Sequence, residues 1–173
     1  LEWCESDMQF VRYVLSHSPL KNLSVRGSYL YGGDITLHRL LPSLPPPRTN
    51  SAQVLRVLDV SRSRDDAFNL LIDWVLNDEQ CKITHLFMEE SRFIPRRVMP
   101  PHLIIEVLSV AGYDRPSHNY DDEETFPFLD IQAWGVIPSM REINASGCKF
   151  DEIQRNSLIT TCPHVVFDFR TEF

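Results

Sequence analysis

The stretch Met140–Phe150, with the sequence MREINASGCKF, has a spacing of apolar residues that fits neither a plain strand nor a plain helix. Strict alternation of apolar and polar residues, which is typical of a half-buried strand, holds only across residues 143–145. A pattern of this kind that recurs along a chain indicates a repeat. The apolar positions are Met140, Ile143, Ala145, Cys148 and Phe150.

The same pattern recurs along most of the chain. Copies begin at residues 20, 55, 83, 105 and 140, and successive copies start 35, 28, 22 and 35 residues apart. A degraded copy starts 24 residues further on, with His164 where the other copies carry an apolar residue. Each copy predicts a short parallel strand whose alternate residues face opposite ways. We expect these strands near residues 23–25, 58–60, 86–88, 108–110, 143–145 and 167–169.

The position of Cys148 holds a polar residue in the other copies, where a side chain can bond to backbone groups of the turn after the strand. Serine does this readily, and a cysteine thiol does it weakly and tolerates burial. The residues that occupy this position are Ser28, Ser63, Ser91, Tyr113 and Cys148.

The segments between the copies predict helices. Residues 65–80, DDAFNLLIDWVLNDEQ, place Phe68, Leu71, Ile72, Val75 and Leu76 on one helical face, and Asp65 or Asp66 is expected to cap the start. A helix over residues 6–17 is expected with Ser6 as its cap. Residues 150–162 predict a third helix whose inward residues are Phe150, Ile153, Leu158 and Ile159. Alternating strands and helices predict one α/β domain over residues 1–173.

Two inserts account for the two longest intervals. Residues 41–51 contain four prolines and can form neither a helix nor a central strand. Residues 117–126 are polar and include four consecutive acids, Asp121–Glu124. Surface loops are the simpler interpretation of both. The alternatives are a proline-rich docking site, and an acidic patch or a helix cap before Pro127.

The repeated pattern resembles the leucine-rich repeat, with the signature L-x-x-L-x-L-x-x-N/C-x-L. Five copies match in order, although only Cys148 meets the consensus at the Asn/Cys position. The predicted helices make the chain similar to the ribonuclease-inhibitor-like subclass. The resemblance implies a horseshoe-shaped solenoid of five to six repeats, with parallel strands on the concave face and helices on the convex face. It also implies that the chain is part of a longer one.

Composition excludes several classes of protein. The net charge of −7 and the pI of about 5.3 count against a general binder of nucleic-acid phosphates. No apolar run approaches the ~20 residues needed to cross a bilayer, and the first residues do not resemble a signal peptide. The four cysteines are scattered without a C-x-x-C pair, which favours reduced thiols and a cytoplasmic or nuclear location.

No recognisable constellation for catalysis is present. The chain lacks the G-x-S-x-G, Walker-type and H-E-x-x-H motifs, and its six histidines are dispersed. We therefore expect no enzymatic activity, no cofactor and no metal site. His85 lies within a strand match, where a surface histidine needs no further role.

The resemblance implies that binding occurs on the concave face, at the solvent-facing positions of the strands. Phe87 stands out there, because a large aromatic side chain is costly to leave in water. It is either an anchor for a partner or packed beneath a long loop such as 41–51. Arg26, Arg56, Arg62 and Arg64 predict a local basic cluster that could receive carboxylates. The predicted binding residues are Phe87, Arg26, Asp59, Ser61, Arg62, Arg64, Glu89 and Asn144.

The functional expectation is a non-enzymatic module that presents this face to a protein partner. The resemblance extends to substrate-receptor subunits of cullin-RING ubiquitin ligases, although no F-box or cullin-box is recognisable. An assembly scaffold or adaptor, and an RNA-binding or RNA-export module, are the alternatives. A second docking surface is expected at the C-terminal end, where the chain stops at a predicted strand without a helix to cover it.

Overall fold

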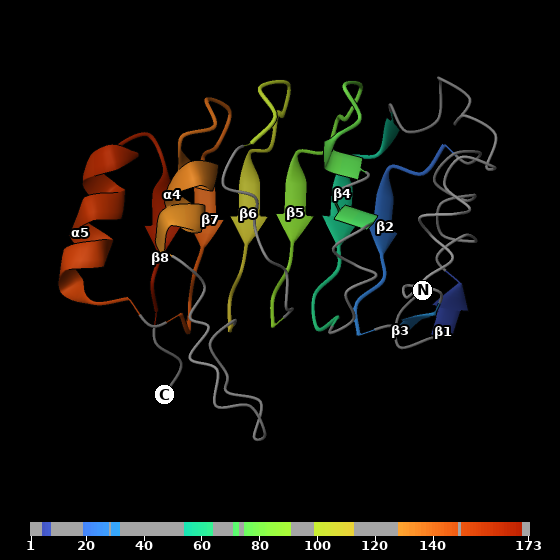
Figure 1. Ribbon diagram of the computed structural model, residues 1–173, viewed down its shortest axis with the longest axis horizontal. Coiled ribbons are helices and arrows are strands. Elements are labelled where there is room, and N and C mark those ends of the chain that lie inside the picture. Colours follow the sequence, from blue (N-terminus) through green and yellow to red (C-terminus); the bar gives the residue numbers. More distant parts are fainter. Residues whose placement is uncertain are drawn as a thin grey trace.

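The computed structural model describes residues 5–7, 19–27, 29–31, 54–63, 71–72, 75–90, 99–112, 128–148 and 150–170. Six parallel strands form one open sheet in the order of the sequence (Figure 1). The predicted α/β class and the order of the strands are confirmed, and each strand begins one residue earlier than predicted. The strands are β2 (Asn22–Ser24), β4 (Val57–Asp59), β5 (His85–Phe87), β6 (Val107–Ser109), β7 (Glu142–Asn144) and β8 (Val166–Asp168).

The central residue of each strand lies beside the central residue of the next. Five of the six are buried, while Phe167 in β8 is only partly buried. Because neighbouring residues of a strand point to opposite faces, the first and third residues of each strand lie on the other side of the sheet. We call that side the open face. The central column is Leu23, Leu58, Leu86, Leu108, Ile143 and Phe167.

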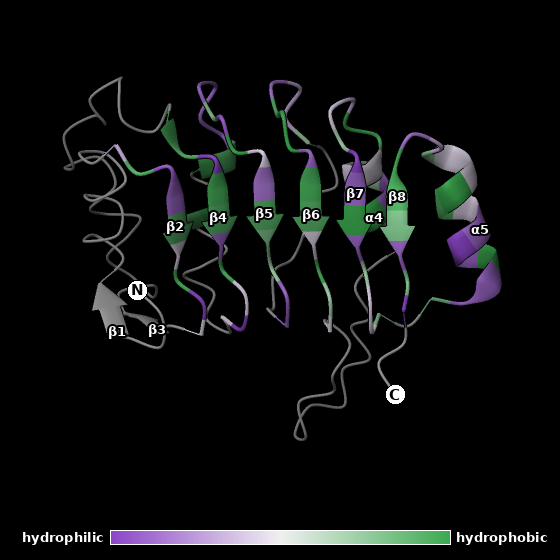
Figure 2. Cartoon of the chain, turned by 180° about the vertical axis from the view of Figure 1, so that it is seen from behind, coloured by the Kyte–Doolittle hydropathy of each residue, from purple (hydrophilic) through white to green (hydrophobic). Residues whose placement is uncertain are grey.

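A helix covers the C-terminal part of the sheet on the face opposite the open face (Figure 1). Helix α4 (Phe128–Gly135) lies over the C-terminal strands in Figure 1, and in the reverse view of Figure 2 the strands lie in front of it. Trp134 of α4 and Leu158 of α5 (Glu152–Thr161) are fully buried in the same core as the central column. The hydrophobic core therefore lies between the sheet and the helices.

Backbone hydrogen bonds hold the strands together from the residue before each strand. The carbonyl of Lys21 accepts from the N–H groups of Arg56 and Val57, at 2.7 and 3.1 Å. The carbonyls of Arg56, Thr84 and Glu106 each accept two such bonds from the next strand. This shared acceptor repeats across the sheet. It gives a hydrogen-bond partner to the first N–H group of a strand and to the N–H group just before it. We call the residues before these strands the entry rim. It consists of Lys21, Arg56, Thr84 and Glu106, which supply the shared acceptor, and Arg141, whose carbonyl accepts from the Val166 N–H.

The N-terminal helix prediction is wrong at its start. Glu5–Asp7 form a strand, β1, which pairs in parallel with β3 (Tyr29–Tyr31) in a separate two-stranded sheet. A strand partner rich in tyrosine, which is favoured in sheets, overrides the local capping signal of Ser6. Residues 8–17, the rest of the predicted helix, lie outside the described residues.

Helix α5 forms where a helix was predicted, but its buried face is narrower than expected. Leu158 is fully buried, whereas Ile153 and Ile159 are 79% and 51% exposed, so their predicted inward orientation is wrong. At roughly 100° per residue these three side chains project in three different directions, and only one direction faces the core. A capping box starts the helix, in which Gln154 N–H donates to Asp151 Oδ1 at 2.7 Å.

The other helical expectations have mixed outcomes. Residues 71–72 and 75–76 are helical and their side chains are buried, as predicted for this part of the segment 65–80. Phe68, Asp65 and Asp66 lie outside the described residues. Helix α4 was not predicted, although the spacing of its buried Ile131 and Trp134 is helical.

In the polar position after the strands, the side chain of Cys148 has a hydrogen-bond partner, whereas that of Ser63 has none among the described residues. The buried Cys148 Sγ donates to the carbonyl of Val110 on the neighbouring strand at 3.4 Å. Ser63 is also buried, and its hydroxyl finds no partner among the described residues, so its predicted bond to the turn is absent there. The remaining members of this row, Ser28, Ser91 and Tyr113, lie outside the described residues.

Two of the cysteines have free, buried thiols, Cys81 and Cys162. Burial raises the pKa of both thiols, which disfavours the reactive thiolate. We expect both to react slowly with Ellman's reagent in the native protein and rapidly once the protein is unfolded in denaturant. Rapid native labelling of a Cys4→Ser variant would contradict their burial, because this variant removes the cysteine that lies outside the described residues.

Replacing Leu86 tests the central column. Leu86 is fully buried with strands on both sides, so Leu86→Ala should lower the free energy of unfolding by roughly 2–5 kcal/mol in urea denaturation. The control Ile153→Ala removes an exposed side chain from α5 and should change stability by no more than about 0.5 kcal/mol. Equal effects of the two changes would show that the column is not the core.

Candidate functional site

The open face carries an apolar patch at its centre. Val57, His85 and Val107 are neighbours on adjacent strands, and all three are partly exposed. Phe87, two residues after His85, is also partly exposed, and the two rings lie 6.5 Å apart. These four residues, which we call the central patch, offer solvent-accessible apolar surface in the middle of a sheet.

Phe87 lies on the solvent side of β5, as predicted. It stands between Asp59 and Ser109 of the neighbouring strands and is not part of the core. The alternative that Phe87 lies beneath the loop 41–51 falls outside the described residues. His85 is held in place by Thr84, whose Oγ1 lies 2.9 Å from His85 Nδ1.

A network of polar side chains borders the central patch. Arg26 Nη2 lies 3.3 Å from Glu89 Oε2, and Arg26 Nη1 lies 3.9 Å from Asp59 Oδ2. Ser109 Oγ donates to Glu89 Oε1 at 2.8 Å, and Ser24 Oγ donates to Asp59 Oδ2 at 3.2 Å. The network spans four strands and fixes the predicted site residues Arg26, Asp59 and Glu89 before any partner is bound.

Ser61 was predicted to face solvent, and this is wrong because it is fully buried. Backbone bonds from Gly27 to Ser61 and from Arg62 to Glu89 place Ser61 in register between Arg26 and Glu89. The Arg26–Glu89 ion pair therefore crosses above Ser61, whose hydroxyl accepts from the Glu89 N–H at 3.2 Å. Ser61 supports the network from below and is not available to a partner.

Asp59 and Asn144 also close the turns after their strands. Asp59 Oδ1 accepts from the Ser61 N–H at 2.9 Å, and Asn144 Oδ1 accepts from the Ser146 N–H at 3.0 Å. Side-chain acceptors of this kind stabilise tight turns. Both residues are partly exposed on the open face, so they combine a structural bond with a surface position.

The two turn residues after each strand form a second edge of the sheet, which we call the exit rim. The second residue of each turn has a positive φ, and in three turns it is glycine. In the other two it is Arg62, at φ 61°, and Glu90, at φ 51°. The exit rim consists of residues 26–27, 61–62, 89–90, 111–112 and 146–147.

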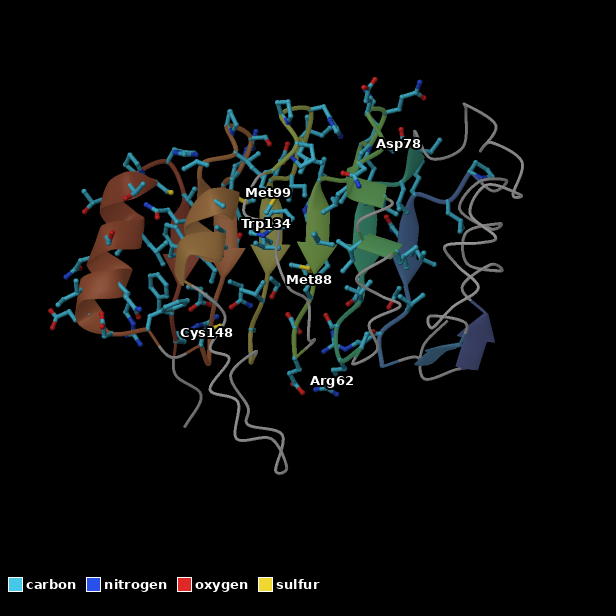
Figure 3. The ribbon with its side chains drawn as sticks, viewed as in Figure 1. Arg62, Asp78, Met88, Met99, Trp134 and Cys148 are labelled. Carbon is cyan, nitrogen blue, oxygen red and sulfur yellow. The ribbon has the colours of Figure 1, made fainter. Side chains whose placement is uncertain are left out.

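Arg62 and Glu90 lie on neighbouring strands and pair with each other, with Arg62 Nη2 3.4 Å from Glu90 Oε1. A left-handed conformation costs a residue with a side chain about 1–2 kcal/mol, and an exposed ion pair returns at most about 1 kcal/mol. The pair therefore does not offset the strain of two such residues. Both charged side chains are held at the exit rim, where Figure 3 labels Arg62.

The predicted basic cluster is not a single patch. Arg26 and Arg62 lie on the exit rim and pair with acids, while Arg56 lies on the entry rim and donates to the Lys82 carbonyl at 3.0 Å. A three-residue strand, about 10 Å long, separates the two rims. The prediction of one cluster is wrong because Arg56 precedes its strand and the other arginines follow theirs. Arg64 lies outside the described residues.

The C-terminal edge of the sheet is partly apolar. Among the described strands β8 pairs with β7 alone, and its Val166 is 69% exposed. Phe169 stacks on Phe167 with ring centroids 5.4 Å apart, and both side chains are only partly buried. Arg170 hydrogen-bonds to Asp168 and lowers the pKa of that carboxyl group. Docking of a partner at this edge stays a prediction.

No three metal-ligating side chains come together within the described residues, and no helix there is long and apolar enough to span a bilayer. Comparisons with known proteins leave the family open: no family model, no curated protein and no solved structure matches the chain.

Sequence reasoning missed the role of Glu90 and of Lys21. The signal for Glu90 was available, because the aligned position in three other copies is Gly27, Gly112 and Gly147, and glycine at a fixed turn position indicates a positive φ. The pairing of Arg26 with Glu89 could not be read from the sequence, because 63 residues separate the two partners.

Two glycine substitutions test the packing of the exit rim. A Cβ on Gly112 would lie 2.9 Å from Glu90 Cγ, whereas a Cβ on Gly147 would meet no atom closer than 3.4 Å, and both glycines have positive φ. Gly147→Ala should lower the free energy of unfolding by about 1–2 kcal/mol through φ alone, and Gly112→Ala by more. In a Glu90→Ala background the two changes should cost the same. A Gly112→Ala penalty that survives in this background would show that Glu90 does not contact Gly112.

Proposed function

We propose that this chain is a non-enzymatic protein-interaction module of the leucine-rich repeat type, and that its open face binds a polypeptide partner. The repeat assignment is supported by the column of strand-centre residues, which are the apolar residues with which the predicted strands begin. The bond from Cys148 to the Val110 carbonyl also supports it, since this is the structural role expected at the Asn/Cys position. On this proposal the open face is the concave side of a horseshoe.

The central patch is the observation that carries the binding proposal. Phe87, Val57 and Val107 keep apolar surface in contact with water although the core lies only one side chain away. Covering such surface releases about 25 cal/mol per Å² of apolar area, and aromatic residues dominate the energetics of protein interfaces. A partner that covers Phe87 therefore gains more from this part of the face than from the polar network.

The network around the patch supports rapid, specific docking. Arg26, Asp59 and Glu89 already hold one another, so these side chains lose little freedom when a partner arrives. Binding surfaces that are ordered in advance pay less conformational entropy on association. A polar border around an apolar centre is also the usual anatomy of a protein interface.

The setting that fits the chain best is the cytoplasm or nucleus, because Cys81 and Cys162 carry free thiols. Substrate recognition for a cullin-RING ubiquitin ligase is the most specific role within this proposal, and it rests on the resemblance alone. A scaffold or adaptor would use the same face. RNA binding is disfavoured by the net charge of −7 and by the acids that pair with Arg26 and Arg62.

Removing the Phe87 side chain tests the proposal. A partner is first captured from cell extract with the immobilised chain, and its binding kinetics are then measured on purified variants. Phe87→Ala should weaken binding by about 2 kcal/mol or more, mainly through faster dissociation, and should leave the fold intact. The control Ile153→Ala removes an exposed apolar side chain from α5, away from the open face, and should bind like the parent.

Two results would contradict this proposal. Wild-type affinity of a folded Phe87→Ala variant would place the interface on another surface. Unfolding of that variant, seen by circular dichroism, would make Phe87 a core residue.

A further inference from the structure

The distribution of unpaired positive charge on the open face points to one class of partner. We propose that the face binds an extended acidic peptide, whose apolar side chain covers the central patch and whose carboxylate binds Lys21 and Arg56 on the entry rim. This inference rests on the proposed function, since it names the chemistry of the partner at the same face.

Positive charge on the exit rim is already neutralised. Arg26 pairs with Glu89 and lies near Asp59, and Arg62 pairs with Glu90. A carboxylate that approached either arginine would have to displace an acid that the fold holds nearby. The exit rim is therefore a poor site for an anionic partner.

The entry rim differs in its first two strands. Lys21 and Arg56 are both exposed, and the Lys21 carbonyl accepts from the Arg56 N–H, so the two residues are neighbours. Neither is paired with an acid in the part of the chain that the structure describes. The Arg56 guanidinium donates one bond, to the Lys82 carbonyl, through Nη1. That bond orients the guanidinium and leaves its other N–H groups available to a carboxylate.

The acids nearest to this part of the entry rim have other roles. Glu106, two strands from Arg56, lies 4.0 Å from Arg141 in a weak ion pair. Asp78 belongs to the turn before β5, where its Oδ1 accepts from the Gln80 N–H. Glu79 is exposed in that same turn, three residues before the exposed Lys82. Among the described residues, Lys21 and Arg56 are therefore left without a neutralising acid beside β2 and β4.

The sheet geometry sets the spacing of the two contacts. Neighbouring strands lie about 4.8 Å apart, so Phe87 and Lys21 are separated by about 10 Å across the strands. Lys21 is level with Thr84, so Phe87 also lies about 10 Å further along the strand direction, and the direct separation is about 14 Å. Val107 lies one step further from Lys21. An extended peptide advances about 3.3 Å per residue. A peptide that runs diagonally over the face thus places its acidic residue about four positions from its apolar anchor to reach Lys21, or about three positions to reach Arg56, which lies one strand step closer.

A polypeptide fits this surface better than a nucleic acid. Nucleic-acid sites use several cations to neutralise successive phosphates and present aromatic faces for stacking. This site has two adjacent cations and a patch in which Val57 and Val107 are aliphatic. Aliphatic surface next to a small cationic site suits an apolar side chain followed by a carboxylate.

Selection of peptides on the full chain tests the inference. A library of random dodecapeptides is panned on the immobilised protein, and the affinities of the enriched peptides are measured by fluorescence anisotropy. We expect peptides with an apolar residue and an acid three to four positions away. The double variant Lys21→Gln/Arg56→Gln should bind them about tenfold more weakly or worse, with a reduced dependence on salt. The matched control, Arg62→Gln/Arg141→Gln, removes two ion-paired arginines and should stay within about twofold of the parent.

The outcomes separate this inference from the proposed function. Peptides that lose affinity on Phe87→Ala but ignore the Lys21/Arg56 double variant, or that carry no acids, would overturn the acidic partner and leave the binding face standing. Peptides that depend on Lys21 and Arg56 but not on Phe87 would overturn the apolar anchor. Enrichment of no peptide, or of peptides indifferent to all these variants, would count against both. Binding of a labelled oligouridylate that requires Phe87 and Arg56 would replace the peptide with RNA.

Discussion

The buried column at the centre of the sheet depends on neighbours on both sides. Leu58, Leu86 and Leu108 have no exposed surface, because each lies between two equivalent side chains of the neighbouring strands, within one hydrophobic core. Phe167 occupies the same position in β8 but remains partly exposed, since β7 is its one partner among the described strands. A single strand–helix unit cannot bury its own apolar residue, so stability comes from stacking such units.

This stacking decides what the open face can carry. Once the column and the residues after each strand are buried on the helix side, the alternate positions must face away from the core. Their chemistry is then free of packing demands, and the chain places apolar residues in the middle and paired charges toward the exit rim. The shared backbone acceptors on the entry rim keep adjacent strands in register, so residues far apart in sequence become reliable neighbours.

Some open-face positions do serve the fold. Asp59 and Asn144 accept hydrogen bonds that close their turns, and Arg62 and Glu90 tolerate a left-handed backbone where other turns use glycine. Strained residues with charged side chains persist only when the surrounding structure holds them in place. Here the neighbouring turns supply that support through backbone hydrogen bonds, since the Arg62 N–H donates to the Glu89 carbonyl and the Glu90 N–H donates to the Ala111 carbonyl. The polar groups of the exit rim are thus mostly paired with one another, whereas Lys21 and Arg56 on the entry rim are not paired with an acid in the described part of the chain.

Much of the architecture was determined by the sequence alone. The repeated spacing of apolar residues predicts which residues share a strand and which side chains face the core. That spacing assigned Cys148 to a position that tolerates burial, and Phe87 to the solvent side. Local signals also predicted helix α5. They could not predict that Ile153 and Ile159 would remain exposed, because the width of a buried helical face depends on what packs against it.

Tertiary structure alone decided the chemistry of the open face. Ser61 became buried because Arg26 reaches over it to Glu89, and the predicted basic cluster divided between two rims because strand direction separates residues before a strand from residues after it. Contacts of this kind join residues tens of positions apart, and a periodic pattern carries no information about which long side chain crosses to which neighbour. Spacing along one chain therefore specifies the direction of each side chain, while pairing between charges depends on the distances that only the folded sheet creates.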